Sequence, residues 1–434
     1  MNKAIKIGYL GLFFLWNVCF IESVAQSSTK ALVKDLKDIT DIMVYDVTSP
    51  VAAARYYAYI TLVSYECLSA YQPTQYQSFL PLINEPLSIK LEVRPIFSNP
   101  SLAYRYALLY AANKILPSGS KLLPEVKKLE LELKPIEIKY VHHIATTILD
   151  YSKTDGFLQL NNLKKYTPKR GAGYWQPTQP AFMAPIEPNW NSIRTFFLLK
   201  SDQFLTQPPV AFDMNPQSEF YRLTQEVKNV VEENNPVKNE IAAFWDCNPY
   251  AISQIGHLEF GLKKISPGGH WMGIAGIASI RSKMTIENAL FSHTLLALSL
   301  HDAFVACWDE KYRSNRIRPE TVINTYLDKK WTPILQTPPF PEYVSGHSVI
   351  STTSAEILTL LFGDNFKFRD NTEKEFGLRT RSYKSFRQAA EEACISRFYG
   401  GIHYLDAIIE GQNQGFKVGS YIVSKTNSLQ LRLP

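Results

Sequence analysis

The feature that most constrains this chain is helical periodicity, with apolar side chains recurring three and four residues apart over long windows. Strand-like runs of alternating residues are few and short. The run Thr48-Ser49-Pro50 supplies a helix start signal ahead of the first window. The predicted helices cover residues 51–71, 101–115, 137–152, 218–233, 285–308, 348–362 and 385–397. These patterns predict an all-α fold of packed helical bundles.

Long proline-rich connections separate the predicted helices, at residues 80–100, 166–188, 207–216 and 332–341. They are longer than the links of a plain bundle, and ordered loops of this length usually line sites or wrap a domain. We divide the chain into an N-terminal helical layer with its linker at 26–240, a C-terminal helical bundle at 241–425, and a tail at 426–434.

The first 25 residues resemble a secretory signal peptide rather than part of the fold. Lys3 and Lys6 precede an apolar stretch at 7–20, and Ser23-Val24-Ala25 forms a small-residue cleavage site. The mature chain is therefore expected to begin near Gln26, and the protein is expected to be exported to the periplasm or the extracellular space.

Charge and hydropathy argue against a nucleic-acid-binding protein and against a membrane-spanning one. Lys plus Arg number 46 against 40 Asp plus Glu, and this small, dispersed excess does not suggest a nucleic-acid partner. After the signal segment, no window of 18 apolar residues lacks a charge. The best candidate, 288–307, contains His293, His301 and Asp302, so we interpret it as the core helix of a soluble protein.

Four cysteines follow the signal segment, and they show no CxxC pair and no regular spacing: Cys67, Cys247, Cys307 and Cys394. This irregularity argues against metal binding through them. Export permits one disulfide bridge, while the apolar helical setting of Cys67 and Cys307 favours buried free thiols at least as strongly.

Three groups of residues between 301 and 406 carry the candidate chemistry. In the first, Lys311 and Arg318 are seven residues apart, which on a continuous helix places both cations on one face, two turns apart. Pro319 then ends or kinks that helix. The alternative is a solvated basic stretch, because Arg313 and Arg316 add further charge.

The second group is Val344-Ser345-Gly346-His347-Ser348, which opens an apolar helix. Ser345 is a predicted N-cap, Gly346 permits close approach of a ligand, and the exposed N–H groups form an anion site. His347 would then stand beside the anion. The alternative is a plain N-cap with an incidental histidine.

The third group runs from Ser396 to Asp406. On a straight helix Arg397 and His403 would point about 120° apart. The pair Gly400-Gly401 breaks the helix, so that both side chains can turn to one point. Asp406, three residues later on the resumed helix, is predicted to accept a bond from one imidazole nitrogen and leave the other free as a nucleophile or ligand.

Together the groups supply three cations, Lys311, Arg318 and Arg397, which match a tetrahedral oxyanion. In this order the motifs Lys-x6-Arg-Pro, Ser-Gly-His and Ser-Arg-x5-His-x2-Asp resemble the signature shared by type-2 phosphatidic acid phosphatases and vanadium-dependent haloperoxidases. The runs 267–271, 302–303, 308–311 and 338–342 resemble the haloperoxidase branch, and 51–55 resembles the N-terminal helix of secreted bacterial members. One departure is Val344, where the family usually has proline.

The resemblance implies two four-helix bundles with one site in the C-terminal bundle. It implies that His403 binds vanadium, that His347 assists peroxide protonation, and that Trp308 and Phe340 shape the halide side. It further implies a set of residues that hold the vanadate oxygens: Lys311, Arg318, Ser345, Gly346 and Arg397. In the phosphatase branch the same frame holds phosphate, with His403 as covalent nucleophile and His347 as general acid.

Three functions follow, in order of preference. The first is an exported vanadium-dependent haloperoxidase that uses hydrogen peroxide, a halide and a small organic acceptor. The second is an exported acid phosphatase that forms a phospho-histidine on a phosphomonoester, with phosphate in the vanadate site. The third is a non-catalytic oxyanion-binding protein, which we rank last because a cluster of cations without an anion is costly. Lipid phosphatases usually carry several membrane spans, which this chain lacks.

Two further residues are open at this point. His270 is either a residue supporting the site or a loop residue held by its own turn, and we favour the loop. Asp302 could brace a cation of the site, although a structural ion pair is the simpler interpretation.

Overall fold

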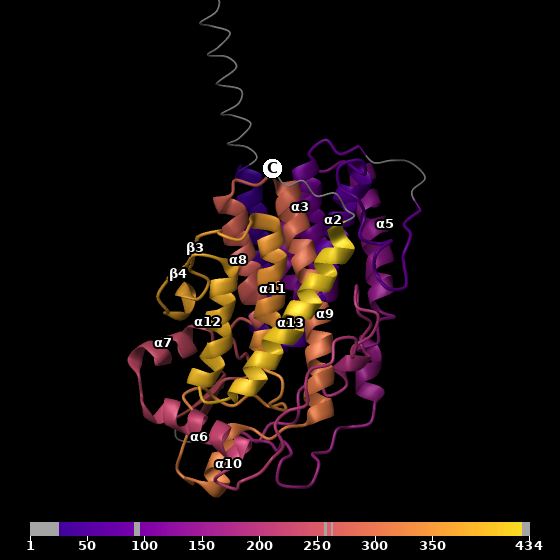
Figure 1. Ribbon diagram of the computed structural model, residues 1–434. Helices are drawn as coiled ribbons and strands as arrows, with labels where there is room; N and C mark the ends of the chain where they lie inside the picture. Colours follow the sequence, from indigo (N-terminus) through magenta and orange to yellow (C-terminus); the bar gives the residue numbers. More distant parts are fainter. Residues whose placement is uncertain (1–25, 91–95, 256–257, 262–263, 428–434) are drawn as a thin grey trace, which may run out of the picture.

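The computed structural model describes residues 26–90, 96–255, 258–261 and 264–427, and these form a mostly helical protein with two short hairpins (Figure 1). The predicted signal segment lies outside the described residues, as does most of the predicted tail. Residues 26–45 are helical and precede α2 (Pro50–Tyr71), α3 (Pro100–Ile115), α4 (Leu123–Glu130) and α5 (Pro135–Ser152). Short 3-10 helices occur at η1 (Gly119–Leu122), η2 (Phe157–Asn162) and η3 (Trp190–Ser192).

The second half of the chain begins with α6 (Glu219–Glu232) and α7 (Pro236–Phe244), followed by the antiparallel pair β1 (Ile252–Ile255) and β2 (Leu258–Gly261). Then come α8 (Pro267–Arg281), α9 (Ile286–Ser314), α10 (Pro319–Tyr326) and α11 (Gly346–Phe362). A second antiparallel pair, β3 (Phe368–Asp370) and β4 (Arg381–Tyr383), encloses η4 (Lys374–Phe376) and precedes α12 (Phe386–Tyr399) and α13 (Leu405–Thr426).

Local capping explains where many of these helices begin. The side chains of Ser49, Asn99 and Ser266 each accept a backbone N–H bond of the first turn, and proline follows each of them at the first helical position. A capping oxygen satisfies a donor that the helix cannot, and proline has no N–H to satisfy there. All seven predicted helices are confirmed as parts of helices.

Helix α9 lies at the centre of the protein and packs against α2, α8, α11 and α13 (Figure 1). Among the described residues it is the helix long and apolar enough to cross a membrane, and its apolar window is entirely buried inside the protein. The prediction of a core helix is therefore confirmed. One hydrophobic core extends from Leu32 to Ile422, so helices from both halves of the chain share it. The division at 240 and 241 stays a prediction.

Helix α13 approaches α11 more closely than ordinary side chains allow. Three glycines, four residues apart on α13, face α11. A Cβ atom on Gly411 would lie 2.8 Å from the carbonyl oxygen of Ser345, and one on Gly415 would lie 2.5 Å from that of Val349. On Gly419 it would lie 2.9 Å from Cβ of Glu356. Because real Cβ atoms do not come this close, glycine is required for the contact.

The four cysteines of the described residues are all free and all buried. The expectation of buried thiols is therefore confirmed, and no disulfide forms among these four.

Candidate active site

Three segments distant in sequence meet at one end of the bundle: the end of α9, the start of α11 and the link between α12 and α13 (Figure 1). They enclose a small cavity. Its wall includes six of the residues singled out from the sequence, Trp308, Phe340, Gly346, His347, Arg397 and His403. The second and third sequence groups therefore meet at this cavity, as predicted, and the first group joins them through Arg318, whose Nη1 is 3.2 Å from Nε2 of His403.

His403 lies in the break between two helices. Helix α12 ends at Tyr399, Gly401 adopts a left-handed φ of 78°, and α13 begins at Leu405. Nδ1 of His403 is 2.8 Å from Oε1 of Glu342, and Nε2 is 3.2 Å from Nη1 of Arg318. Burial, and then the positive charges of Arg318 and Lys311, hold the pKa of His403 well below its ordinary value. The imidazole is thus neutral, with Nδ1–H donating to Glu342 and the Nε2 lone pair facing the cations.

The carboxylate that orients His403 is Glu342, and the prediction for Asp406 is wrong. Asp406 Oδ2 is instead 2.7 Å from Nη1 of Arg316. His403 precedes α13, so the three-residue spacing of a helix does not set the direction of its side chain. Glu342 also accepts the backbone N–H of Tyr404, and burial raises its pKa to about 7. The signal that could have identified it is a lone carboxylate in a proline-rich run just ahead of Ser-Gly-His.

Arg318 is fully buried beside His403. Its Nε donates to the carbonyl of Phe340 and its Nη1 to that of Ile402, both at 2.9 Å. Burial lowers its pKa to about 10. The predicted continuous helix from Lys311 to Arg318 is wrong, because α9 ends at Ser314 with a left-handed C-cap at Asn315, and Pro319 begins α10.

Lys311, in the last turn of α9, is fully buried and binds the backbone that leads into α11. Its ammonium donates to the carbonyls of Pro341 and Glu342, each at 3.1 Å, and to that of Val344. Burial lowers its pKa to about 7. Lys311 therefore fixes the backbone that leads into the predicted anion site.

The start of α11 has the predicted N-cap. Oγ of Ser345 accepts from the backbone N–H of Ser348 at 3.3 Å and from its hydroxyl at 2.9 Å, which leaves the hydroxyl proton of Ser345 available to donate. The N–H groups of Gly346 and His347 lie in the first turn, where a helix offers them no acceptor. A Cβ on Gly346 would lie 3.7 Å from Cε of Lys311, an ordinary van der Waals distance, so Gly346 packs beside the lysine side chain.

Arg397 completes the cluster from α12. Its Nη1 donates to the carbonyl of Trp245 at 3.0 Å, and its Nη2 is 3.9 Å from Oδ1 of Asp246. His347 lines the cavity close by. Burial, and then Arg397, hold the pKa of His347 well below its ordinary value, so its imidazole is neutral and can accept a proton.

Several buried polar atoms of this cluster have no partner in the described part of the protein: Nη2 of Arg318, Nε of Arg397 and Nε2 of His347. A buried donor without an acceptor costs about 1–3 kcal/mol, and more when the group is charged. A tetrahedral oxyanion would accept from both guanidiniums and from the amide of Gly346 at once. The residues present therefore fit such an anion, with Nε2 of His403 directed at it.

Two aromatic side chains, Trp308 and Phe340, form another part of the cavity wall. The rings of Trp308 and Phe340 are 5.1 Å apart at their centroids, and Nε1 of Trp308 donates to the carbonyl of Ile186 at 3.3 Å. Nζ of Lys311 lies 5.9 Å from the ring centroid of Trp308 and 5.1 Å from that of Phe340, and the expected role of both rings toward a halide stays a prediction.

Two secondary predictions need correction. His270 is not a loop residue, because Ser266 and Pro267 start α8 and place it in the first turn, fully buried. Asp302 accepts the backbone N–H groups of 196–198 at 2.6–2.9 Å, so it anchors that segment to α9; among the described residues it neither braces a cation of the site nor forms the structural ion pair that the sequence favours.

Comparison with known proteins agrees with this geometry. The VCPO second helical-bundle domain matches residues 292–430, a range that contains every predicted site residue. No curated protein matches the chain. The crystal structure of a bacterial vanadium-dependent iodoperoxidase has 39% identity and a TM-score of 0.85, covering 92% of this chain and 96% of that one.

Two further similar structures are the holo and apo forms of a bacterial vanadium-dependent chloroperoxidase. Each has 14% identity and a TM-score of 0.69, the holo form covering 88% of this chain and the apo form 87%, with 93% of the other chain covered in both cases. At this identity they show the fold alone. The iodoperoxidase match extends over nearly the whole of both chains, and on that ground this chain belongs to the vanadium-dependent haloperoxidase family.

Proposed function

We propose that this protein is a vanadate-dependent haloperoxidase that oxidises a halide with hydrogen peroxide. The observation that carries the proposal is the neutral imidazole of His403, whose Nδ1–H donates to Glu342 while its unprotonated Nε2 faces buried cations with unpartnered donors. The similarity of this chain to a bacterial iodoperoxidase, over nearly the full length of both chains, supports the same conclusion.

The cluster divides the work of holding vanadate. His403 would provide the bond to vanadium through Nε2, while Arg318 and Arg397 would bind its oxygens with their unpartnered nitrogens. Ser345 and Gly346 would complete the set from the start of α11, and Lys311, whose ammonium donates to three carbonyls, would add its positive charge from the end of α9. An anion at this place also stabilises the ammonium form of Lys311, whose pKa is about 7 through burial.

When bound, vanadate supplies Lewis-acid activation of hydrogen peroxide without changing its oxidation state. Nε2 of His347 has no partner in the described residues and faces the same cavity, so it can take a proton from an incoming peroxide. Trp308 and Phe340 exclude water from the adjoining wall, where a halide would meet fewer competing hydrogen bonds. The organic acceptor would be a small molecule that reacts with the oxidised halide.

The test combines two assays on the same vanadate-loaded protein. We expect peroxide-dependent oxidation of iodide, followed by halogenation of monochlorodimedone where bromide or chloride is also oxidised, and inhibition by phosphate that competes with vanadate. Iodide is the easiest halide to oxidise and hence the fairest test. Oxidation of none of the three halides would contradict the proposal.

An acid phosphatase is the second candidate, because an unprotonated, oriented Nε2 of His403 is also what a phosphoryl nucleophile requires. Hydrolysis of p-nitrophenyl phosphate with an acid-labile, base-stable phospho-histidine would favour this candidate over the first.

We also propose that the protein is exported, on the strength of the signal-like residues 1–25. N-terminal sequencing of the mature protein near Gln26 tests this.

Glu342→Gln is expected to weaken vanadate binding by about 10–100-fold, because the amide keeps the shape of the side chain but no longer supports the basicity and orientation of His403. Calorimetric titration with vanadate measures the effect, and circular dichroism verifies the fold. Asp406→Asn is the matched control. This substitution removes the negative charge that pairs with Arg316, and we expect a much smaller loss of vanadate affinity. A larger loss in Asp406→Asn than in Glu342→Gln would assign the orienting role back to Asp406.

A further inference from the structure

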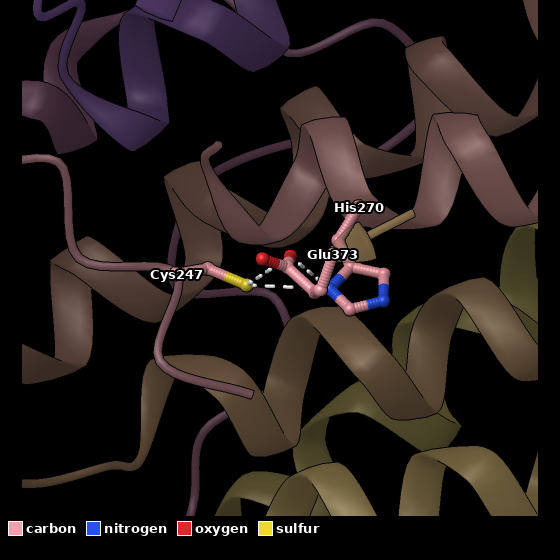
Figure 2. Close-up of side chains that lie close together, drawn as sticks. All are labelled: Cys247, His270 and Glu373. Atoms are coloured by element: carbon pink, nitrogen blue, oxygen red, sulfur yellow. Dashed lines mark hydrogen bonds and ion pairs between the residues drawn. The ribbon is translucent and has the colours of Figure 1, made fainter. Parts of the chain in front are cut away.

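We propose a second ligand site in this protein, for a zinc-type divalent metal ion, formed by Cys247, His270 and Glu373 (Figure 2). The three residues come from the segment after α7, the first turn of α8 and the turn between β3 and η4. One ligand atom from each lies within 4.8 Å of the other two. Figure 2 shows the thiol, the carboxylate and the imidazole turned toward one another.

The distances between the ligand atoms match a tetrahedral site. Bonds of about 2.0–2.2 Å from zinc to nitrogen or oxygen and about 2.3 Å to sulfur imply separations of roughly 3.3–3.6 Å between ligands. Nδ1 of His270 is 3.4 Å from Sγ of Cys247 and 3.1 Å from Oε1 of Glu373, and the sulfur is 3.9 Å from the same oxygen. Shifts of a few tenths of an ångström would bring all three to one ion.

Asp370 prepares the imidazole for this role. Its Oδ2 is 2.7 Å from Nε2 of His270, while its Oδ1 is fixed by the backbone N–H and hydroxyl of Thr372. A carboxylate on one imidazole nitrogen leaves the other as the ligand, an arrangement that recurs around metal-bound histidines. Here the nitrogen left as the ligand is Nδ1, which faces Cys247 and Glu373.

Burial and charge also favour a cation. His270 and Asp370 are 0% exposed, Cys247 is 2% and Glu373 is 3% exposed. The ring of Trp245 stacks on His270 with centroids 4.4 Å apart, which seals one side. Two carboxylates and a thiol around one imidazole are costly to bury unless positive charge is present. A divalent ion would balance the charges of the Cys247 thiolate and Glu373 and leave Asp370 paired with the imidazole N–H of His270, whereas the competing explanation is a protonated His270 between Asp370 and Glu373.

The proposed metal site adjoins the candidate active site but shares none of its anion-binding residues. Cys247 lies on the wall of the active-site cavity, two residues after Trp245, whose carbonyl accepts from Arg397. A metal ion would therefore fix the segment that positions Arg397. The irregular spacing of the cysteines argued against a metal site at the level of the sequence. Spacing detects only ligands within a local motif, and the ligands proposed here come from three distant segments.

The experiment uses the full chain without an affinity tag and without vanadate, treated with a chelator and then titrated with Co2+. We expect one equivalent to bind and to produce the visible bands of tetrahedral cobalt with a near-ultraviolet thiolate band, both displaced by Zn2+. Cys247→Ser should lose the thiolate band, and Asp370→Asn should weaken Zn2+ binding by about 10–100-fold. Cys67→Ser, which removes a buried thiol from α2, is the matched control and should change neither.

Failure of the folded wild-type chain to bind Co2+ would overturn the proposal and leave the protonated His270 as the explanation. An unchanged cobalt spectrum in folded Cys247→Ser would also overturn it. Should that variant not fold, the Zn2+ affinity of Asp370→Asn decides, and an affinity equal to that of the wild type overturns the proposal. None of these outcomes depends on haloperoxidase activity.

Discussion

Replacing His403 with alanine is expected to abolish peroxide-dependent iodide oxidation, with the rate falling by more than about 100-fold, because losing a ligand costs more than losing its hydrogen-bond partner. The imidazole is neutral and its Nδ1–H is held by Glu342, so Nε2 is oriented to bond vanadium. The surrounding cations remain and should still hold some vanadate. The measurement is the initial rate of iodide oxidation after loading with saturating vanadate.

His143→Ala is the matched control, since His143 lies exposed on α5 and should retain the wild-type rate. A wild-type rate in vanadate-loaded His403→Ala would remove His403 from the reaction. The same variant separates the two enzymatic candidates, because a phosphatase would lose its phospho-histidine together with p-nitrophenyl phosphate hydrolysis.

Arg397→Ala is expected to weaken vanadate binding by about 2–5 kcal/mol, which corresponds to roughly 30- to 5,000-fold in affinity. Part of this loss is the cost of leaving the anion with fewer donors in a buried place. The guanidinium of Arg397 is 1% exposed and its Nε has no partner among the described residues, so it can bond an anion without giving up another contact. Calorimetric titration with vanadate measures the loss.

Two further variants make this test specific. Arg397→Lys keeps the charge but loses the planar fork, and an intermediate affinity is expected. Arg387→Ala removes an exposed arginine from the same helix, where it pairs with Glu356, and should leave vanadate binding unchanged. Equal affinities in Arg397→Ala and the wild type would show that Arg397 serves only to hold the carbonyl of Trp245.

The sequence predicted the long helices well, because their apolar faces are buried against one core and repeat over several turns. It missed the helix at 26–45 and α8, whose Pro-Gly-Gly start resembles a loop, and of α13, which carries Gly411, Gly415 and Gly419, it predicted only that a helix resumes after Gly400-Gly401. In α13 those glycines are spaced for contact with α11, a reason that only tertiary packing reveals.

For the site, the sequence predicted which residues meet but not which atoms they bind. The Gly400-Gly401 break and the Ser345 cap are local features, so their consequences could be predicted. The choice between Asp406 and Glu342 depends on how two distant segments approach each other, and no spacing within one motif encodes it. The end of α9 at Asn315 similarly depends on a left-handed residue in an otherwise helical pattern.

The three glycines of α13 fix the position of α11, which forms one wall of the active site. Gly411 and Gly415 contact the carbonyls of Ser345 and Val349, so the position of the anion-binding end of α11 is set by backbone atoms that have no rotamers to adjust. A larger residue at one of these glycines would translate the whole helix and carry the amide of Gly346 with it. The segment 338–342 is held instead by side chains, because Lys311 donates to the carbonyls of Pro341 and Glu342 and Arg318 donates to that of Phe340. The anion-binding end of α11 is therefore positioned by backbone packing, whereas the proline-rich segment is positioned by side chains that a substitution can change.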